Sequence, residues 1–278
     1  MIYIRRGILI VFTLMTAIWI SVNVFIIRGK DTQPPVILGT EDVIEVSVNA
    51  TDEELKAGLS ASDNVDKDIS DKIRVGNHSK FIIPGVCEVE YLVFDSSYNV
   101  GKYTRRIVYK DYKSPEFYVK SPLVYKASQS DSPSILSNIG ASDVLDGDIS
   151  DKIKITEQDI DITTAGTYTV TLEVANNYAD ISTVKLPVHV VDKSSAFNKE
   201  PTIQLNQYLV YLEEGEYLNP VDYISEVIDS NGNNVNLNYV DIITHESISE
   251  SDVYEIEYRY TERNGATGST YLIVVLAE

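Results

Sequence analysis

The feature that most constrains the fold is an internal repeat that runs through most of the chain. The segment ASDNVDKDISDKI begins at Ala61, and the closely matching ASDVLDGDISDKI begins at Ala141. Another pair of matching segments begins at Pro84 and Ala165, and a third copy of it begins at Ser251. Since independent landmarks agree on the spacing, we expect three structural units of one design, each able to fold from about 80 residues.

Apolar and polar residues alternate within each copy. In residues 168–174 every second position is apolar, and residues 254–260 repeat the pattern with charged residues between the apolar ones. This alternation is typical of a strand with one buried face, so we expect those charges to face water. Asn-Asn at 176–177 and Asn-Gly at 264–265 are turn signals. Short strands with close turns predict an all-β fold of antiparallel sandwiches.

The amino terminus carries a long apolar segment. Residues 7–27 contain no charged residue, and a helix of that length spans about 30 Å, the thickness of a bilayer core. We therefore expect a cytoplasmic tail at 1–6, a transmembrane helix at 7–27 and an extracytoplasmic remainder in the cell membrane. Charge alone does not fix this orientation, because basic residues flank the run almost equally. The alternative is a cleaved signal peptide, although no Ala-x-Ala site follows the run.

The repeated motifs resemble a known family. Pro-Val-Ile at 35–37, Ala-Ser-Asp-x-x-Asp-x-Asp-Ile-Ser at 61–70 and Pro-Gly-x-x-x-Val-x-Tyr at 84–91 are similar to bacterial Ig-like surface domains. Such modules occur in Gram-positive cell-surface proteins and on an insecticidal crystal toxin. The resemblance implies a β-sandwich in an extracytoplasmic setting and no single activity. The expected Ig-like domains span 34–110, 114–192 and 200–278, the last divergent and acidic, with a flexible linker at 193–199.

An acidic turn recurs in the first two repeats. Its matched carboxylates are Asp63, Asp66 and Asp68 in the first repeat and Asp143, Asp146 and Asp148 in the second. Calcium takes six to eight oxygen ligands, so the pattern predicts a Ca²⁺ site in each turn. The calcium loop of an EF-hand does not fit, because Asp151 replaces the required glycine. The alternative is that these side chains shape the turn through hydrogen bonds to the backbone.

Charge and composition exclude several classes of function. The net charge is −19, and residues 31–278 hold 42 acidic against 19 basic residues, which argues against nucleic-acid binding. The single cysteine, Cys87, excludes an internal disulfide and a cysteine zinc cluster, and the strand register predicts that it faces inward. Three histidines argue against an active site built on several histidines. No nucleophile elbow, zinc-protease or phosphate-loop motif occurs, so we expect no enzyme and no cofactor besides Ca²⁺. A carboxylate pair for glycoside hydrolysis depends on three-dimensional spacing and is left open.

Two functions fit this organisation. In the first, the anchored protein presents a binding surface on its last domain to a cell-wall polymer, a glycan or a protein. That domain holds nine of the 19 tyrosines, and from Glu200 onward 15 acidic residues stand against two basic ones. Such a field attracts cationic partners and repels anionic ones. In the second, the domains form a structural stalk that binds nothing.

Overall fold

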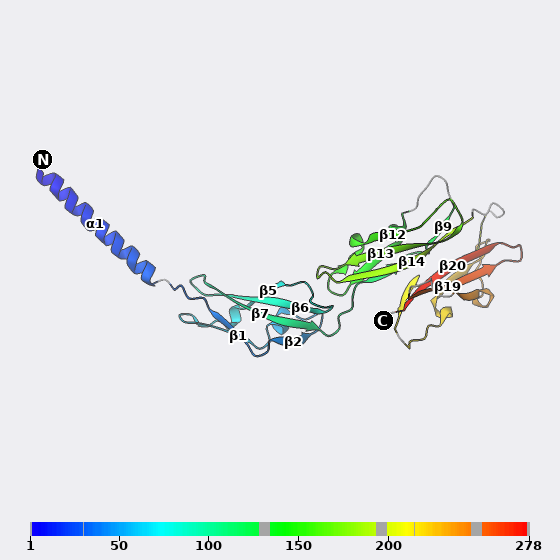
Figure 1. Ribbon diagram of the computed structural model, residues 1–278, viewed down its shortest axis with the longest axis horizontal. Coiled ribbons are helices and arrows are strands. Elements are labelled where there is room, and N and C mark those ends of the chain that lie inside the picture. Colours follow the sequence, from blue (N-terminus) through cyan, green and yellow to red (C-terminus); the bar gives the residue numbers. More distant parts are fainter. Residues whose placement is uncertain are drawn as a thin grey trace. The chain divides into compact units, whose positions relative to one another are not determined.

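The chain consists of one amino-terminal helix followed by β-structure (Figure 1). The computed structural model describes residues 2–29, 31–127, 134–192, 199–213, 215–245 and 252–276. The chain forms two compact units, one of residues 1–79 with 86–110 and one of residues 80–85 with 111–278. We describe each unit by itself. We call residues 31–79 with 86–110 domain 1, residues 111–192 domain 2 and residues 199–276 domain 3.

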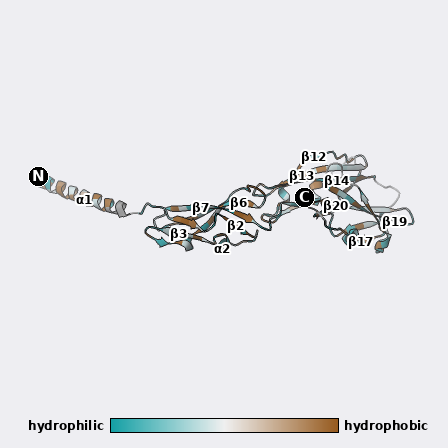
Figure 2. Ribbon diagram, turned by 60° about the horizontal axis from the view of Figure 1, so that its bottom comes forward, coloured by the Kyte–Doolittle hydropathy of each residue, from teal (hydrophilic) through white to brown (hydrophobic). Residues whose placement is uncertain are grey.

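From residue 7 on, helix α1 (Ile2–Gly29) exposes mostly apolar side chains in its described part. Phe12 and Trp19, for example, expose about two thirds of their surface, 68% and 65%. Figure 2 shows the apolar residues along the helix. A helix without a polar face is not suited to water, and its Tyr3–Val24 segment is long and apolar enough to cross a bilayer. The same length and composition also fit a signal sequence.

Domain 1 is a sandwich of two β-sheets. The three-stranded sheet has the order β1 (Val36–Gly39), β3 (Leu59–Asp63) and β4 (Lys67–Asp68). The four-stranded sheet has the order β2 (Val43–Val46), β7 (Val100–Tyr109), β6 (Val86–Phe94) and β5 (Arg74–His78). Two short helices, α2 (Asp52–Leu55) and η1 (Ser70–Lys72), connect strands. Thr51 and Glu54 form a capping box that starts α2.

Domains 2 and 3 repeat this arrangement. In domain 2 the three-stranded sheet has the order β8 (Glu116–Val119), β10 (Ile139–Asp143) and β11 (Gly147–Asp148). Its four-stranded sheet has the order β9 (Val124–Lys126), β14 (Ile181–Val191), β13 (Gly166–Ala175) and β12 (Lys154–Gln158). In domain 3 the two-stranded sheet pairs β15 (Thr202–Leu205) with β17 (Ile224–Ile228). Its four-stranded sheet has the order β16 (Leu209–Leu212), β20 (Thr267–Leu276), β19 (Val253–Thr261) and β18 (Asp241–His245). The 3₁₀ helices are η2 (Ile135–Asn138), η3 (Ser150–Lys152), η4 (Pro220–Tyr223) and η5 (Leu237–Tyr239).

The predicted all-β architecture of three tandem Ig-like sandwiches is confirmed, with one difference in strand direction. Each four-stranded sheet contains a parallel pair, which joins β2 to β7, β9 to β14 and β16 to β20. The reason is that the first strand of each domain is split between the two sheets. Its first half pairs antiparallel in the small sheet, and its second half crosses over to lie beside the last strand of the domain. The whole domain thus serves as the crossover that a parallel pair requires.

The alternating pattern defines the core of each sandwich. On β6 the side chains of Cys87, Val89, Tyr91 and Val93 are completely buried, while the residues between them are more exposed. This confirms the inward position of Cys87 expected from the sequence. Burial raises the pKa of the Cys87 thiol to about 11, so it stays protonated at neutral pH.

Domains 2 and 3 share a hydrophobic cluster within the second unit. Leu209, Val253 and Ile273 of domain 3 pack into the cluster formed by the core of domain 2. On β20 the neighbours of Ile273 in sequence, Leu272 and Val274, belong instead to the core of domain 3. Strand β20 is therefore buried on both faces. Residues 193–198 of the expected linker between these domains lie outside the described residues.

The packing of domain 2 against the four-stranded sheet of domain 3 corrects one prediction from the sequence. The sequence pattern placed Glu255 and Glu257 of β19 on a solvated face, yet they are 6% and 3% exposed. They lie on the face of the sheet that domain 2 covers, and alternation alone does not distinguish a solvated face from one covered by another domain. Glu255 pairs with His189 of domain 2 through an Oε1–Nε2 distance of 2.9 Å. Glu257 pairs with Arg259 within domain 3.

Candidate functional site

The last carboxylate of each acidic turn forms hydrogen bonds within the same turn. Asp68 Oδ1 accepts hydrogen bonds from the backbone N–H and the hydroxyl of Ser70, at 3.0 and 2.7 Å. Asp148 makes the same two bonds with Ser150. These bonds lower the pKa of both carboxyl groups below the ordinary value. The geometry is that of side-chain-to-backbone turn stabilisation.

The middle carboxylate reaches a neighbouring turn instead of its own. Asp66 accepts hydrogen bonds from the backbone and hydroxyl of Ser96. Asp146 accepts bonds from the backbone and side-chain amides of Asn177, at 2.6 and 3.1 Å, and also pairs with Lys152. In domain 1 this carboxylate connects the turn after β3 to the turn between β6 and β7. In domain 2 it connects the turn after β10 to the turn between β13 and β14. The structure therefore does not bring the three predicted ligands of either turn together.

The first carboxylate of the domain 1 turn meets acidic partners from elsewhere in the sequence. Asp63, at the end of β3, lies beside Asp31 and Asp95, and the three carboxylates offer oxygen atoms within 4.8 Å of one another. Among the residues that the structure describes, this is the one such group of three. Asp31 precedes β1, and Asp95 follows β6. Of the predicted ligands, only Asp63 belongs to the group.

The corresponding position in domain 2 is a closed hydrogen-bond network. Asn176 takes the place that Asp95 has in the first repeat and replaces its carboxylate with an amide. Asn176 Nδ2 donates to Asp143 Oδ2 at 3.1 Å and to the Tyr112 hydroxyl at 2.9 Å. The Tyr112 hydroxyl donates to Asp180 at 2.6 Å. Burial raises the pKa of Tyr112 far above its ordinary value, so this hydroxyl remains a donor.

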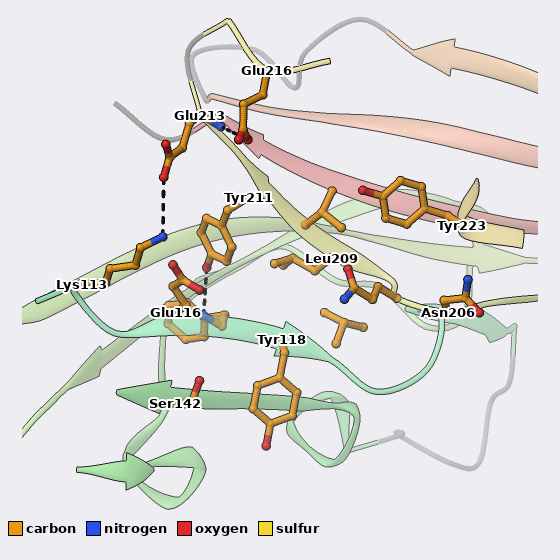
Figure 3. A pocket seen from close by; sticks show the side chains of 14 residues that line it. Lys113, Glu116, Tyr118, Ser142, Asn206, Leu209, Tyr211, Glu213, Glu216 and Tyr223 are labelled. Atoms are coloured by element: carbon orange, nitrogen blue, oxygen red, sulfur yellow. Dashed lines mark hydrogen bonds and ion pairs between the residues drawn. The ribbon is translucent and has the colours of Figure 1, made fainter. Parts of the chain in front are cut away.

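A pocket lies in the second unit where domains 2 and 3 meet (Figure 3). Its volume is about 610 Å³, within the range of small-molecule and sugar sites. Strand β8 of domain 2 and strand β16 of domain 3 contribute to its walls, as do Asn206 and Gln207. Tyr118, Tyr211 and Tyr223 present aromatic rings along it, and Figure 3 shows them on different sides.

Hydrogen bonds and close packing hold two of these rings. The backbone N–H of Phe117 donates to the Tyr211 hydroxyl at 2.9 Å, and burial raises the pKa of Tyr211 to about 12. Tyr118 lies over Gly140, where an added Cβ would come within 2.2 Å of the ring. Only glycine permits that position of the ring. The aromatic walls are thus fixed in place, which lowers the entropy cost of binding.

The pocket carries an excess of negative charge. Glu116, Glu213 and Glu216 line it together with a single basic residue, Lys113, which pairs with Glu213 at 3.6 Å (Figure 3). The sequence predicted an acidic surface on domain 3, with tyrosines as candidate binding residues, but not its position. The contribution of domain 2 was not predicted, because nothing in the sequence indicated that these two domains pack together.

Comparisons with known proteins give one relative in sequence. No family model matches the chain. A search of curated proteins finds the pesticidal crystal protein Cry22Aa of Bacillus thuringiensis, 26% identical over 227 residues. The match covers 79% of this chain and 30% of the crystal protein, so the chain spans less than a third of that relative.

The matches among solved structures are more distant. One is the CBM51-2 and INT domains of Clostridium perfringens ZmpB in complex with GlcNAc, at 15% identity, 58% and 41% coverage of the two chains and a TM-score of 0.29. Another is Drosophila N-cadherin EC1-4, at 13% identity, 89% and 76% coverage and a TM-score of 0.21. Because both TM-scores are far below 0.5, we draw no conclusion about function from these structures.

Proposed function

We propose that the chain is a bacterial membrane protein that α1 anchors in the bilayer and whose Ig-like domains lie outside the cytoplasm. There the pocket between domains 2 and 3 binds a hydroxyl-rich glycan of the cell wall or cell surface, without catalysis. The observation that carries the proposal is the pocket of rigid tyrosines and carboxylates. The apolar surface of α1 supports the anchor, and the similarity to Cry22Aa supports membership in the bacterial Ig-like surface domains.

The chemistry of the pocket favours a particular class of glycan. Carboxylates accept hydrogen bonds from hydroxyl groups, and side-chain amides both accept and donate them. Tyrosine rings offer flat apolar surface to sugar rings. The excess of carboxylates repels anions. The expected ligand is therefore a neutral or amino-bearing polysaccharide, and polymers rich in phosphate or carboxylate should bind more weakly.

Two substitutions in the pocket test this proposal. In the full chain in detergent micelles, Glu116→Lys and Gln207→Ala should each weaken binding of neutral wall polysaccharide by roughly tenfold or more, because each removes a hydrogen-bond acceptor from the pocket. Both residues are exposed, so the fold should tolerate the changes. Asp241→Lys is the matched control, since Asp241 is an exposed acid of domain 3 outside the pocket lining and should change affinity less than twofold.

The measurement is titration calorimetry with fragments of neutral and of phosphate-bearing wall polymer. Equal losses in Glu116→Lys and Asp241→Lys would show that binding depends on overall charge and not on the pocket. Absence of binding to wall glycans by the unmodified chain would leave the structural stalk as the better account.

A further inference from the structure

The cluster of Asp31, Asp63 and Asp95 in domain 1 has the composition of a cation site. Its three carboxylates converge from separate parts of the chain, with oxygens within 4.8 Å of one another. Asp63 and Asp95 are 8% and 6% exposed, so water screens their charges poorly. Within the described part of the chain, no lysine or arginine forms an ion pair with any of the three. Like charges this close repel unless a proton or a cation lies among them.

One oxygen of the cluster lacks a partner. Asp63 Oδ2 accepts the backbone N–H groups of Val65 and Asp66, at 2.6 and 3.1 Å. Asp63 Oδ1 is fully buried and has no hydrogen-bond partner among the described residues. Nearly all buried polar atoms in folded proteins have a partner, so an orphaned carboxylate oxygen within an acidic cluster points to a ligand that is not protein.

The groups around the cluster hold the other carboxylates in place. Asp95 accepts hydrogen bonds from the backbone and side chain of Asn99, at 2.8 and 2.6 Å. Asn99 Nδ2 also donates to the backbone oxygen of Asp31 at 3.2 Å. Asp31 Oδ1 accepts the backbone N–H of Gln33. These bonds orient the carboxylates before any ion binds, which reduces the cost of assembling the site.

In domain 2, protein hydrogen bonds satisfy the carboxylate that corresponds to Asp63. There the carboxylate of Asp143 receives the amide of Asn176, and the Tyr112 hydroxyl bridges Asn176 to Asp180. In domain 1 the residue at the position of Tyr112 is Thr32, and Asp95 stands where domain 2 has Asn176. Asn99 of domain 1 stands where domain 2 has Asp180, so the amide and the carboxylate exchange places, and domain 1 lacks the Tyr112 hydroxyl.

An all-carboxylate donor set with this spacing suits calcium. Oxygens bound at 2.3–2.6 Å from one ion are separated by at most about 5 Å, and the three carboxylates satisfy that limit. Magnesium needs a tighter octahedron with ligands at about 2.0–2.1 Å. We therefore propose that domain 1 binds one Ca²⁺ through Asp31, Asp63 and Asp95, with water completing its shell, and that the acidic turn of domain 2 binds none.

The site would connect three parts of domain 1. Asp31 follows closely after the end of α1 at Gly29, Asp63 ends β3 and Asp95 begins the turn after β6. A bound ion would fasten the residues that follow the anchor helix to both sheets of the sandwich. This inference concerns domain 1 and is independent of the pocket in the second unit.

The test is Ca²⁺ titration of the full chain in detergent micelles, with calcium chloride as the probe. The unmodified chain should bind one Ca²⁺. Asp31→Asn and Asp95→Asn should each weaken Ca²⁺ affinity by roughly tenfold or more, because each removes one charged ligand. Asp68→Asn in the same turn and Asp148→Asn in domain 2 are matched controls, and each should change the affinity less than twofold.

Thermal unfolding of domain 1 supplies a second readout that does not depend on titration. In chelator, Asp95→Asn should melt above the unmodified chain, because it removes a repelling charge and supplies the amide that domain 2 uses. In millimolar Ca²⁺ the order should reverse. Three results would each overturn the proposal. They are no Ca²⁺ binding at millimolar concentrations, binding of a second Ca²⁺, and a loss of Ca²⁺ affinity in Asp68→Asn equal to that in Asp31→Asn.

Discussion

Replacing Arg105 with alanine should destabilise domain 1 by about 3 kcal/mol or more, since hydrogen bonds to a charged group contribute about 1.5–3 kcal/mol each. Arg105 is 2% exposed on β7, with its guanidinium over the ring of Tyr91. It donates to the backbone oxygens of Leu55 and Ala57 and to the Tyr91 hydroxyl. These contacts hold the end of α2 against the sheet, and alanine would leave the two carbonyls without this donor.

The repeat supplies an informative second variant. The equivalent positions in domains 2 and 3 are Leu186 and Leu272, both completely buried. Arg105→Leu should therefore cost less than Arg105→Ala, because leucine fills the space and removes a buried charge. Arg106→Ala, at an exposed neighbouring position, is the control and should change stability by less than about 0.5 kcal/mol.

Cys87 makes the measurement specific to domain 1. It is the single cysteine of the chain and is completely buried there, so its reaction with a thiol reagent in increasing urea reports the unfolding of that domain. Ca²⁺ should be held at one concentration throughout. A midpoint for Arg105→Ala within error of that for Arg106→Ala would contradict the role assigned to the guanidinium.

Replacing Ile273 with alanine should destabilise the second unit by about 2–5 kcal/mol, the cost of a cavity in a packed core. Ile273 is 3% exposed and belongs to the cluster that domains 2 and 3 share. The same face carries Tyr271, whose ring stacks on His189 of domain 2 with centroids 3.8 Å apart. Loss of the isoleucine should therefore loosen the packing between the two domains and not only domain 3.

Hydrogen exchange followed by mass spectrometry distinguishes these outcomes. Amides of both β14 and β19 should exchange faster in Ile273→Ala, by roughly 30-fold or more for about 2 kcal/mol. Leu276→Ala on the same strand is the control, because Leu276 is 44% exposed and should have little effect. Faster exchange confined to domain 3 would indicate that the two domains do not stabilise each other.

The repeat and the alternating pattern were sufficient to predict the all-β tandem fold. Both signals are local, because each strand shows its buried face through the spacing of its own residues. The inward position of Cys87 followed from the same rule. The pattern did not reveal that Glu255 and Glu257 are covered, because burial against another domain depends on packing between distant segments.

The acidic turn shows the same limit at the level of single side chains. Residues close in sequence suggested that Asp63, Asp66 and Asp68 would act together. In the folded domain Asp66 and Asp68 bond to serines, and Asp63 meets Asp31 and Asp95, which lie far from it in the sequence on either side. Antiparallel sandwiches bring strand ends together across such distances, so proximity in sequence is a poor guide to a site at the end of a sandwich.

The location of the domains relative to the membrane is tested most directly by protease accessibility in cells. The full chain, with a tag after its last residue, would be expressed in bacteria, and protease would be added to intact spheroplasts. We expect the protein to sediment with the membrane at full mass before digestion, and residues 31–278 to be lost on digestion while cytoplasmic proteins stay intact. A tag protected until the spheroplasts are lysed, or a shortened soluble protein in the medium, would contradict the anchored, extracytoplasmic arrangement.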